Sequence, residues 1–178
     1  MAASTVVKVR RDGTLQLIDG TGTPNTFTVA YENGDVSFDG GAKADRIVIR
    51  DRGTIVGLRK GDDPVPTLSW STNFRNWRDG TNAQLVDVID KTGAASGWTS
   101  VAGSGYEQYL LDIKLTIEGT DLGDSADHTA TASKCLITWS FAEGDPDTLN
   151  CTAEVLGGFT YTGQSCCGNR STLENSET

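Results

Sequence analysis

The stretch Tyr106–Glu118, YEQYLLDIKLTIE, decides how the rest of the sequence is interpreted. From residue 109 to residue 117 an apolar residue stands at every second position, and most of the residues between them are polar or charged. The apolar set is Tyr109, Leu111, Ile113, Leu115 and Ile117. Because successive side chains of a β-strand point to opposite faces, this alternation predicts a strand with one buried face.

Two later stretches repeat the same odd-numbered parity. Their apolar residues are Cys135, Ile137, Trp139 and Phe141 in the first, and Cys151, Ala153 and Val155 in the second. The segment 143–147, EGDPD, is rich in turn-forming residues and predicts a hairpin folded about Pro146. That register pairs Phe141 with Cys151, Trp139 with Ala153 and Ile137 with Val155. A slip of one residue would move the whole apolar set into water, so we predict a well-specified meander of three antiparallel strands.

Two hairpins are predicted at the start of the chain. Val6–Ile18 turns at the segment 12–14, and Phe27–Phe38 turns at Asn33-Gly34, a dipeptide that favours two-residue hairpin loops. The predicted cross-strand pairs are Arg11–Leu15 and Val9–Leu17 in the first hairpin, and Tyr31–Val36 and Val29–Phe38 in the second.

A third hairpin, Arg46–Leu58, turns at the segment 51–54 and is apolar on both faces near its middle. Such a hairpin is either covered on both sides or presents an apolar face to a partner. Its runs Ile47-Val48-Ile49 and Ile55-Val56 carry no charge of the kind that prevents edge-to-edge association, and pairing around a ring of subunits would remove those edges. The candidate interface residues are Ile47, Ile49, Ile55, Val56 and Leu58.

The middle of the chain contains one predicted helix, at about residues 81–91. Thr81 is a candidate N-terminal cap and Gly93 a candidate C-terminal stop, while Leu85 and Ile89 lie on one apolar stripe. Asp87 and Asp90 are expected to face outward. A strand with Leu68 and Trp70 is predicted at 67–72, and the polar segment 119–133 is expected to be a long loop.

The totals fit a single β-rich domain. The chain has 178 residues, 21 of them glycine and 37% hydrophobic, which is enough for one sizeable core. The expected fold is mainly β: an antiparallel β-sandwich or small barrel with one flanking α-helix. We expect one domain at 1–163 and a C-terminal extension at 164–178. The sequence has neither a long apolar run nor a signal-like start, so we expect synthesis in the cytoplasm without membrane insertion.

The composition argues against catalysis and against tight DNA binding. The net charge is −9, whereas nucleic-acid binders need a basic surface. His128 is the only histidine and no nucleophile motif accompanies it, so we expect no enzyme and no cofactor. Asp121, Asp124 and Asp127 are spaced in threes but lack the spacing and closing Glu of an EF-hand loop. We therefore expect no metal site.

The four tryptophans and four cysteines each leave two interpretations open. Core or interface positions are expected for Trp70, Trp77, Trp98 and Trp139, with a sugar-stacking platform as the alternative. Cys135 and Cys151 are expected to be separate, buried free thiols. Cys166 and Cys167 follow the last patterned strand, and either of them is a candidate for a disulfide to a neighbouring subunit, with Cys151 or Cys135 as acceptors. Free thiols on a surface turn are the alternative.

The arrangement resembles the tail tube protein of a long-tailed bacteriophage, a fold shared with type VI secretion tubes. The similarity extends over most of Val6–Tyr161 and is strongest at Gly61–Ser71, GDDPVPTLSWS, and in the helix after it. It implies a structural protein of the virion tail that is assembled in the host bacterial cytoplasm. Six copies would form a ring, and rings would stack into a hollow tube in contact with other tail proteins.

The resemblance also gives the acidic charge a physical meaning. Genome DNA would pass through the tube without specific binding, because carboxylates repel phosphates over roughly 8 Å at physiological salt. Two alternatives remain: another phage structural protein, such as a head-decorating trimer or a tail terminator, and a carbohydrate-binding β-sandwich. A tube protein polymerises, whereas a lectin stays small and exposes clustered tryptophan.

Overall fold

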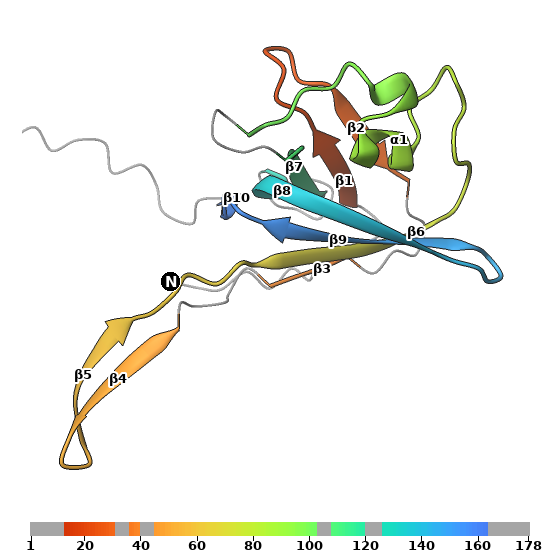
Figure 1. Cartoon of the computed structure of the whole chain (residues 1–178). Coiled ribbons are helices and arrows are strands. Elements are labelled where there is room, and N and C mark those ends of the chain that lie inside the picture. Colours follow the sequence, from red (N-terminus) through yellow and green to blue (C-terminus); the bar gives the residue numbers. More distant parts are fainter. Residues whose placement is uncertain (1–12, 31–35, 40–44, 103–107, 120–125, 164–178) are drawn as a thin grey trace, which may run out of the picture.

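The computed structural model describes residues 13–30, 36–39, 45–102, 108–119 and 126–163 (Figure 1). One antiparallel sheet has the strand order β2-β1-β7-β8-β9-β6-β3, with β10 beside β8, and a second sheet contains only β4 and β5. The large sheet consists of β1 (Gly13–Ile18), β2 (Thr26–Val29), β3 (Ser37–Phe38), β6 (Thr67–Asn73), β7 (Leu111–Ile117), β8 (His128–Ala142), β9 (Thr148–Val155) and β10 (Phe159–Thr162). The other elements are β4 (Arg46–Asp51), β5 (Thr54–Lys60), α1 (Leu85–Asp90) and the short 3-10 helix η2 (Gly93–Ala95). The predicted mainly β, antiparallel fold with one flanking helix is confirmed.

The predicted three-strand meander forms the centre of the large sheet. β7, β8 and β9 are consecutive neighbours, and Leu111, Ile113 and Leu115 are buried as their parity predicts. The register of the β8–β9 hairpin was predicted wrongly by two residues. Phe141 pairs with Leu149, Trp139 with Cys151 and Ile137 with Ala153. A shift of two residues keeps every side chain on its face, so the same face of the hairpin is turned toward the core. The loop becomes shorter, and Leu149 is added to the core.

β8 changes partners halfway along its length. Its first part pairs with β7 and β10, and its second part, from Cys135, pairs with β9. A bulge separates the two parts: Lys134 has a φ of 54°, and its N–H donates to the Asp112 carboxylate at 2.8 Å. The segment predicted as a loop through Ser133 is therefore a strand from His128 onward, because Ile117 and Thr116 of β7 supply backbone partners there.

The first two predicted hairpins are wrong in their pairing. Leu15 and Leu17 have β2 on one side and β7 on the other, so both backbone edges that Arg11 and Val9 would need are occupied. Val29 pairs with Leu15 instead of Phe38, and Phe38 pairs with Leu68 of β6. Tyr31 and the Asn33-Gly34 turn lie outside the described residues. Long-range pairing that buries Leu15 and Val29 prevails over the local turn signal.

The large sheet curls around a single core. Buried side chains from β1, β2, β6, β7, β8, β9 and α1 form one cluster. One end of the curl is closed by a hydrogen bond from the Thr72 hydroxyl at the end of β6 to the Ala30 carbonyl just after β2, at 2.6 Å. Trp70 and Leu68 of β6 point into this core, as predicted. The half-closed sheet matches the expected sandwich or small barrel.

Helix α1 is shorter than predicted and begins later. Its N-terminal cap is Gln84 instead of Thr81, and its C-terminal cap is Lys91, with a φ of 54°, instead of Gly93. Asn82 donates to the Asp79 carboxylate at 2.7 Å, and such local side-chain hydrogen bonds compete with helical ones. Asp87 was predicted to face outward but is buried, whereas Asp90 is exposed as expected. None of the helices in the described ranges has the length and apolar character needed to span a membrane.

Candidate subunit interface

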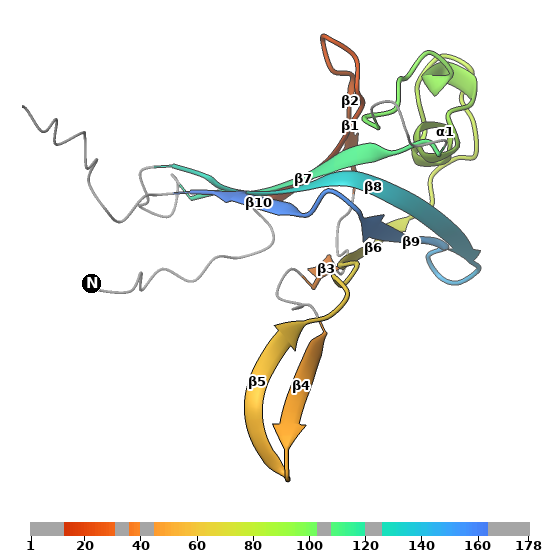
Figure 2. The ribbon, with the colours of Figure 1, turned by 60° about the vertical axis from the view of Figure 1, so that its left-hand side comes forward.

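The β4–β5 hairpin projects away from the large sheet as a separate ribbon (Figures 1 and 2). Its two-residue turn, Arg52-Gly53, has positive φ at both positions, which matches the right-handed twist of the flanking strands. A bulge between Ile49 and Arg50 adds one residue to β5. The predicted hairpin is therefore confirmed, and neither of its faces lies on the body of the protein.

All five candidate interface residues are exposed to a degree unusual for large apolar side chains. The exposed fractions are 55% for Ile47, 37% for Ile49, 55% for Ile55, 61% for Val56 and 63% for Leu58. Large apolar patches on soluble proteins mark interaction sites. The hairpin therefore has the surface expected of a subunit interface.

Cross-strand partners share a face of the ribbon, so the register divides the hairpin into two surfaces. One surface has Ile47 and Ile49 opposite Arg59 and Gly57. The other surface, called here the cationic face, consists of the pairs Arg46–Lys60, Val48–Leu58 and Arg50–Ile55. Its apolar centre is thus bordered by three basic residues.

The sequence alone did not identify a second exposed surface at the opposite end of the protein. We call it the aromatic patch, and it consists of Phe74, Trp77, Trp139 and Phe141. Ring centroids lie 4.7 Å apart for Phe74–Trp77, 5.3 Å apart for Trp77–Phe141 and 5.8 Å apart for Trp77–Trp139. Trp77 is 45% exposed and Phe141 40% exposed, so the cluster reaches the surface.

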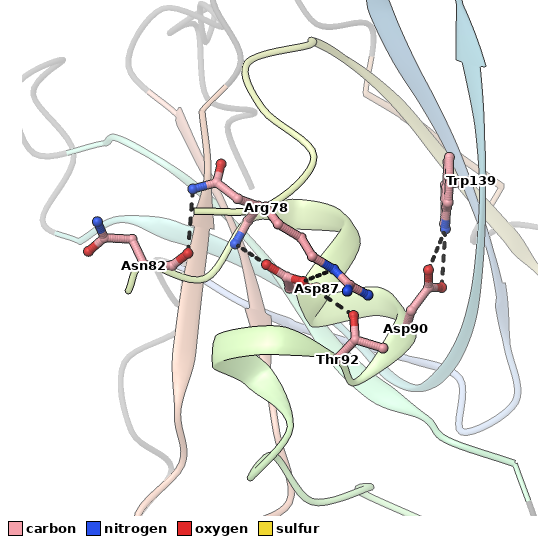
Figure 3. Close-up of polar contacts among 7 residues, drawn as sticks. Arg78, Asn82, Asp87, Asp90, Thr92 and Trp139 are labelled. Atoms are coloured by element: carbon pink, nitrogen blue, oxygen red, sulfur yellow. Dashed lines mark hydrogen bonds and ion pairs between the residues drawn. The ribbon is translucent and has the colours of Figure 1, made fainter. Parts of the chain in front are cut away.

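Helix α1 and the segment before it hold the patch in place (Figure 3). The Trp139 indole N–H donates to the Asp90 carboxylate at 3.1 Å, which ties β8 to the end of the helix. The buried Asp87 accepts from the Thr92 hydroxyl at 3.2 Å and lies 3.4 Å from the Arg78 guanidinium. Arg78 directly follows Trp77, so this ion pair anchors the segment that carries Trp77.

The sequence predicted core or interface positions for Trp77, which is exposed, and for Trp139, which is half-buried, but it did not predict that they form a cluster. Trp139 has core parity and was predicted as core or interface, and it lies at the boundary between the two. Phe74 and Trp77 come from a segment without periodicity. The four rings meet only in the folded chain, because the end of β6, which Phe74 and Trp77 follow, lies near the part of β8 that carries Trp139 and Phe141.

The remaining candidate residues are placed as follows. Cys135 and Cys151 are free and buried, as predicted, and burial raises the pKa of both thiols to about 12. Neither thiol reaches the surface of the isolated chain, and the disulfide between subunits stays a prediction. Cys166, Cys167, Asp121 and Asp124 lie outside the described residues. Within the described ranges no three His, Cys, Asp or Glu side chains are grouped to hold a metal ion.

Comparison with known proteins identifies relatives by structure alone. No family model matches the sequence, and no curated protein matches it either. A chain in the cryo-EM structure of the anti-feeding prophage baseplate, 6-fold symmetrised, superposes with a TM-score of 0.56 and 13% identity, over 92% of this chain and 98% of that chain. A chain in the structure of the tube-terminating cap of the same particle gives 0.55 and 13%, over 92% and 96%. The protein therefore has the fold of subunits found in the baseplate and the tube-terminating cap of the anti-feeding prophage.

Proposed function

We propose that this protein is a structural subunit of a phage-like tail, which forms rings with copies of itself and stacks them into a hollow tube. The observation that carries the proposal is the bare β4–β5 hairpin. A two-stranded hairpin alone in water is marginally stable at best. This one exposes large apolar residues on both faces, so a partner that covers it would stabilise both its fold and the assembly.

The large sheet provides a second means of ring formation. β2 and β3 stand at the two ends of its strand order, so one copy could extend the sheet of the next copy through these edges. Such a contact joins two different surfaces, and a contact of this type closes into a ring when the rotation per copy allows it. Structural similarity to a chain in a 6-fold symmetrised particle supports six copies per ring.

The proposed role of the tube as a conduit for DNA is based on the charge of the chain. The net charge of −9 fits a conduit through which an anionic polymer such as genome DNA passes without adhering. We propose that the protein resides in the tail of the particle, contacts other tail proteins, assembles in the host bacterial cytoplasm and performs no catalysis. The similarity of the fold to the baseplate and cap chains supports the tail-associated structural role within this proposal.

Electron microscopy of the purified full-length protein tests the proposal directly. Grids prepared over a range of protein and salt concentrations are expected to show rings about six-fold in symmetry, or hollow filaments. A compact trimer would favour a head-decorating protein instead. A monomer at every concentration, combined with binding to immobilised glycans, would favour the carbohydrate-binding alternative and overturn the proposal.

A further inference from the structure

Positive charge is concentrated in the β4–β5 hairpin, whereas the rest of the chain is acidic. Residues 46–60 contain five basic residues, namely Arg46, Arg50, Arg52, Arg59 and Lys60, and one acidic residue, Asp51, which gives a net charge of +4. The rest of the chain must then carry −13 for the total to be −9. A cationic, apolar ribbon therefore projects from a strongly acidic body.

The segments around the aromatic patch are acidic, which complements the positive charge of the hairpin. Five carboxylates belong to the segments that form or adjoin the patch: Asp79, Asp90, Glu143, Asp145 and Asp147. The Asp90 carboxylate is hydrogen-bonded to Trp139. Asp147 meets Phe74 through its backbone carbonyl, which accepts from the Phe74 N–H at 2.8 Å, while its carboxylate accepts from the Gly144 N–H at 2.9 Å. Three cations adjoin the patch, Arg75, Arg78 and Lys91, and Arg78 is paired with the buried Asp87.

The cationic face and the aromatic patch are complementary in charge, both have an apolar centre, and they lie far apart in one molecule. The cationic face has Val48, Ile55 and Leu58 at its centre and basic residues at its border. The patch has aromatic rings at its centre and the Asp90 carboxylate bonded to one of them, and the exposed Glu143 and Asp145 lie in the turn that follows Phe141. The hairpin and the end of the β8–β9 hairpin extend in different directions in both views (Figures 1 and 2). One copy therefore presents both halves of the contact without joining them.

We propose that the aromatic patch is the docking surface for the cationic face of the β4–β5 hairpin from a second copy of the chain. This inference rests on the proposed function and assigns the place where the hairpin is received. The apolar centres exclude water from each other, and the aromatic rings also attract the Arg46 and Arg50 guanidinium groups through their faces. The charged borders steer and orient the approach, and salt weakens their attraction.

Charge reversal at each surface, followed by reversal at both, tests the pairing. The hairpin variant is Arg46→Glu/Arg50→Glu, since Lys60 also forms an ion pair with Asp63 at 2.5 Å. The patch variant is Glu143→Lys/Asp145→Lys, both of which are exposed. Each double variant is expected to self-associate at least about tenfold more weakly than the wild type in sedimentation velocity, because like charges would face each other. The quadruple variant should recover association, since both borders are reversed together.

Two single variants control for net charge and folding. Lys114→Glu and Glu154→Lys reverse charges on the sheet face opposite the core, and both should associate as the wild type does. Thermal melting of each variant verifies the fold. A patch variant that associates normally while the hairpin variant fails would mean that the hairpin docks elsewhere, which overturns this inference and leaves ring formation intact. A quadruple variant without recovery also overturns it. A wild type that never associates overturns both proposals.

Discussion

At the scale of single residues, Asp19 shows how a polar loop is held rigid in this fold. Its buried carboxylate accepts from the N–H and side-chain amide of Asn25, from the N–H and hydroxyl of Thr21, and from the Thr99 N–H, at 2.7 to 3.3 Å. These bonds connect the β1–β2 loop to the segment after η2. Burial alone raises the pKa of this carboxyl, but the hydrogen bonds from Asn25, Thr21 and Thr99 outweigh burial and place the pKa below 3.8.

Replacing Asp19 should therefore weaken the fold in a pH-dependent way. Asp19→Ala is expected to lower the free energy of unfolding by about 1–3 kcal/mol in urea titrations at neutral pH, because the hydrogen bonds to a charged, buried carboxylate are lost. A lowered pKa stabilises the fold above the unfolded value of 3.8, and this contribution disappears as the pH falls through the folded pKa. The difference between the wild type and Asp19→Ala should shrink below pH 3.8. Asp39→Ala, at an exposed carboxylate, is the control and should change the free energy of unfolding little at neutral pH. A pH-independent difference would contradict this account.

The buried thiols give a second test at this scale. Burial raises the pKa of Cys135 and Cys151 from 9.0 to about 12, so both are protonated and shielded at pH 8. Site-resolved mass spectrometry after brief iodoacetamide treatment should find both cysteines unmodified in the native protein and fully modified in denaturant. Rapid native labelling at either position would mean that this part of the sheet opens.

At the scale of elements, the junction between β9 and β10 depends on close backbone approach. The Gly157 N–H donates to the Ser133 carbonyl at 2.8 Å, at the bulge where β8 passes from β10 to β9. A Cβ added at Gly157 would lie 2.8 Å from that carbonyl oxygen. The glycine thus allows β10 to continue alongside β8 after β9 ends.

Gly157→Ala is accordingly expected to destabilise the protein by about 1–3 kcal/mol, because a backbone oxygen must move to admit the methyl group. Gly97→Ala is the matched control, since nothing lies within 4 Å of a Cβ at that position. Urea midpoints of the two variants give the comparison. Equal midpoints would show that the bulge relaxes without loss.

The β4–β5 hairpin gives the second element-scale prediction. Ile49→Lys and Val56→Lys should leave the fold of the isolated chain intact, because both side chains are already exposed, at 37% and 61%. In an assembly that covers the hairpin, either lysine would be buried without a partner, which costs several kcal/mol, so rings should not form. Val65→Lys, at an exposed position outside the hairpin, is the control. Normal rings from the two hairpin variants would exclude this element as an interface.

At the scale of the whole molecule, the acidic body predicts weak interaction with nucleic acid. Although the hairpin is basic, the remaining −13 charge opposes approach of a phosphate backbone. In gel shifts at about 150 mM salt, duplex DNA should show no complex below roughly 100 μM protein, weaker than typical non-specific binders. A low-micromolar complex that Arg46→Glu/Arg50→Glu abolishes would instead assign the hairpin to nucleic acid.

The alternation along the meander was enough to predict which face of its strands is buried, although Phe141 on that face is 40% exposed and Leu110 is buried. Strict alternation in β7, β8 and β9 fixes the buried face even though the β8–β9 register was wrong by two residues, since such a shift preserves parity. The sequence by itself also determined the β4–β5 hairpin, because the turn residues and the two apolar runs are adjacent in the chain. These are local features, and local physics suffices for them.

Features that depend on contacts between distant segments could be identified only from the folded structure. The Asn33-Gly34 signal predicted a hairpin, but Val29 pairs with Leu15, where both side chains are buried, and Phe38 pairs with Leu68. Asp87 was expected to face solvent, but it is buried, where it pairs with Arg78 and accepts a hydrogen bond from Thr92. The aromatic patch has no sequence pattern because its rings come from strand β8 and from the distant loop segment that follows β6. The reason is the same in each case: the free energy of these contacts depends on which segments the fold brings together, and the spacing of residues along the chain does not encode it.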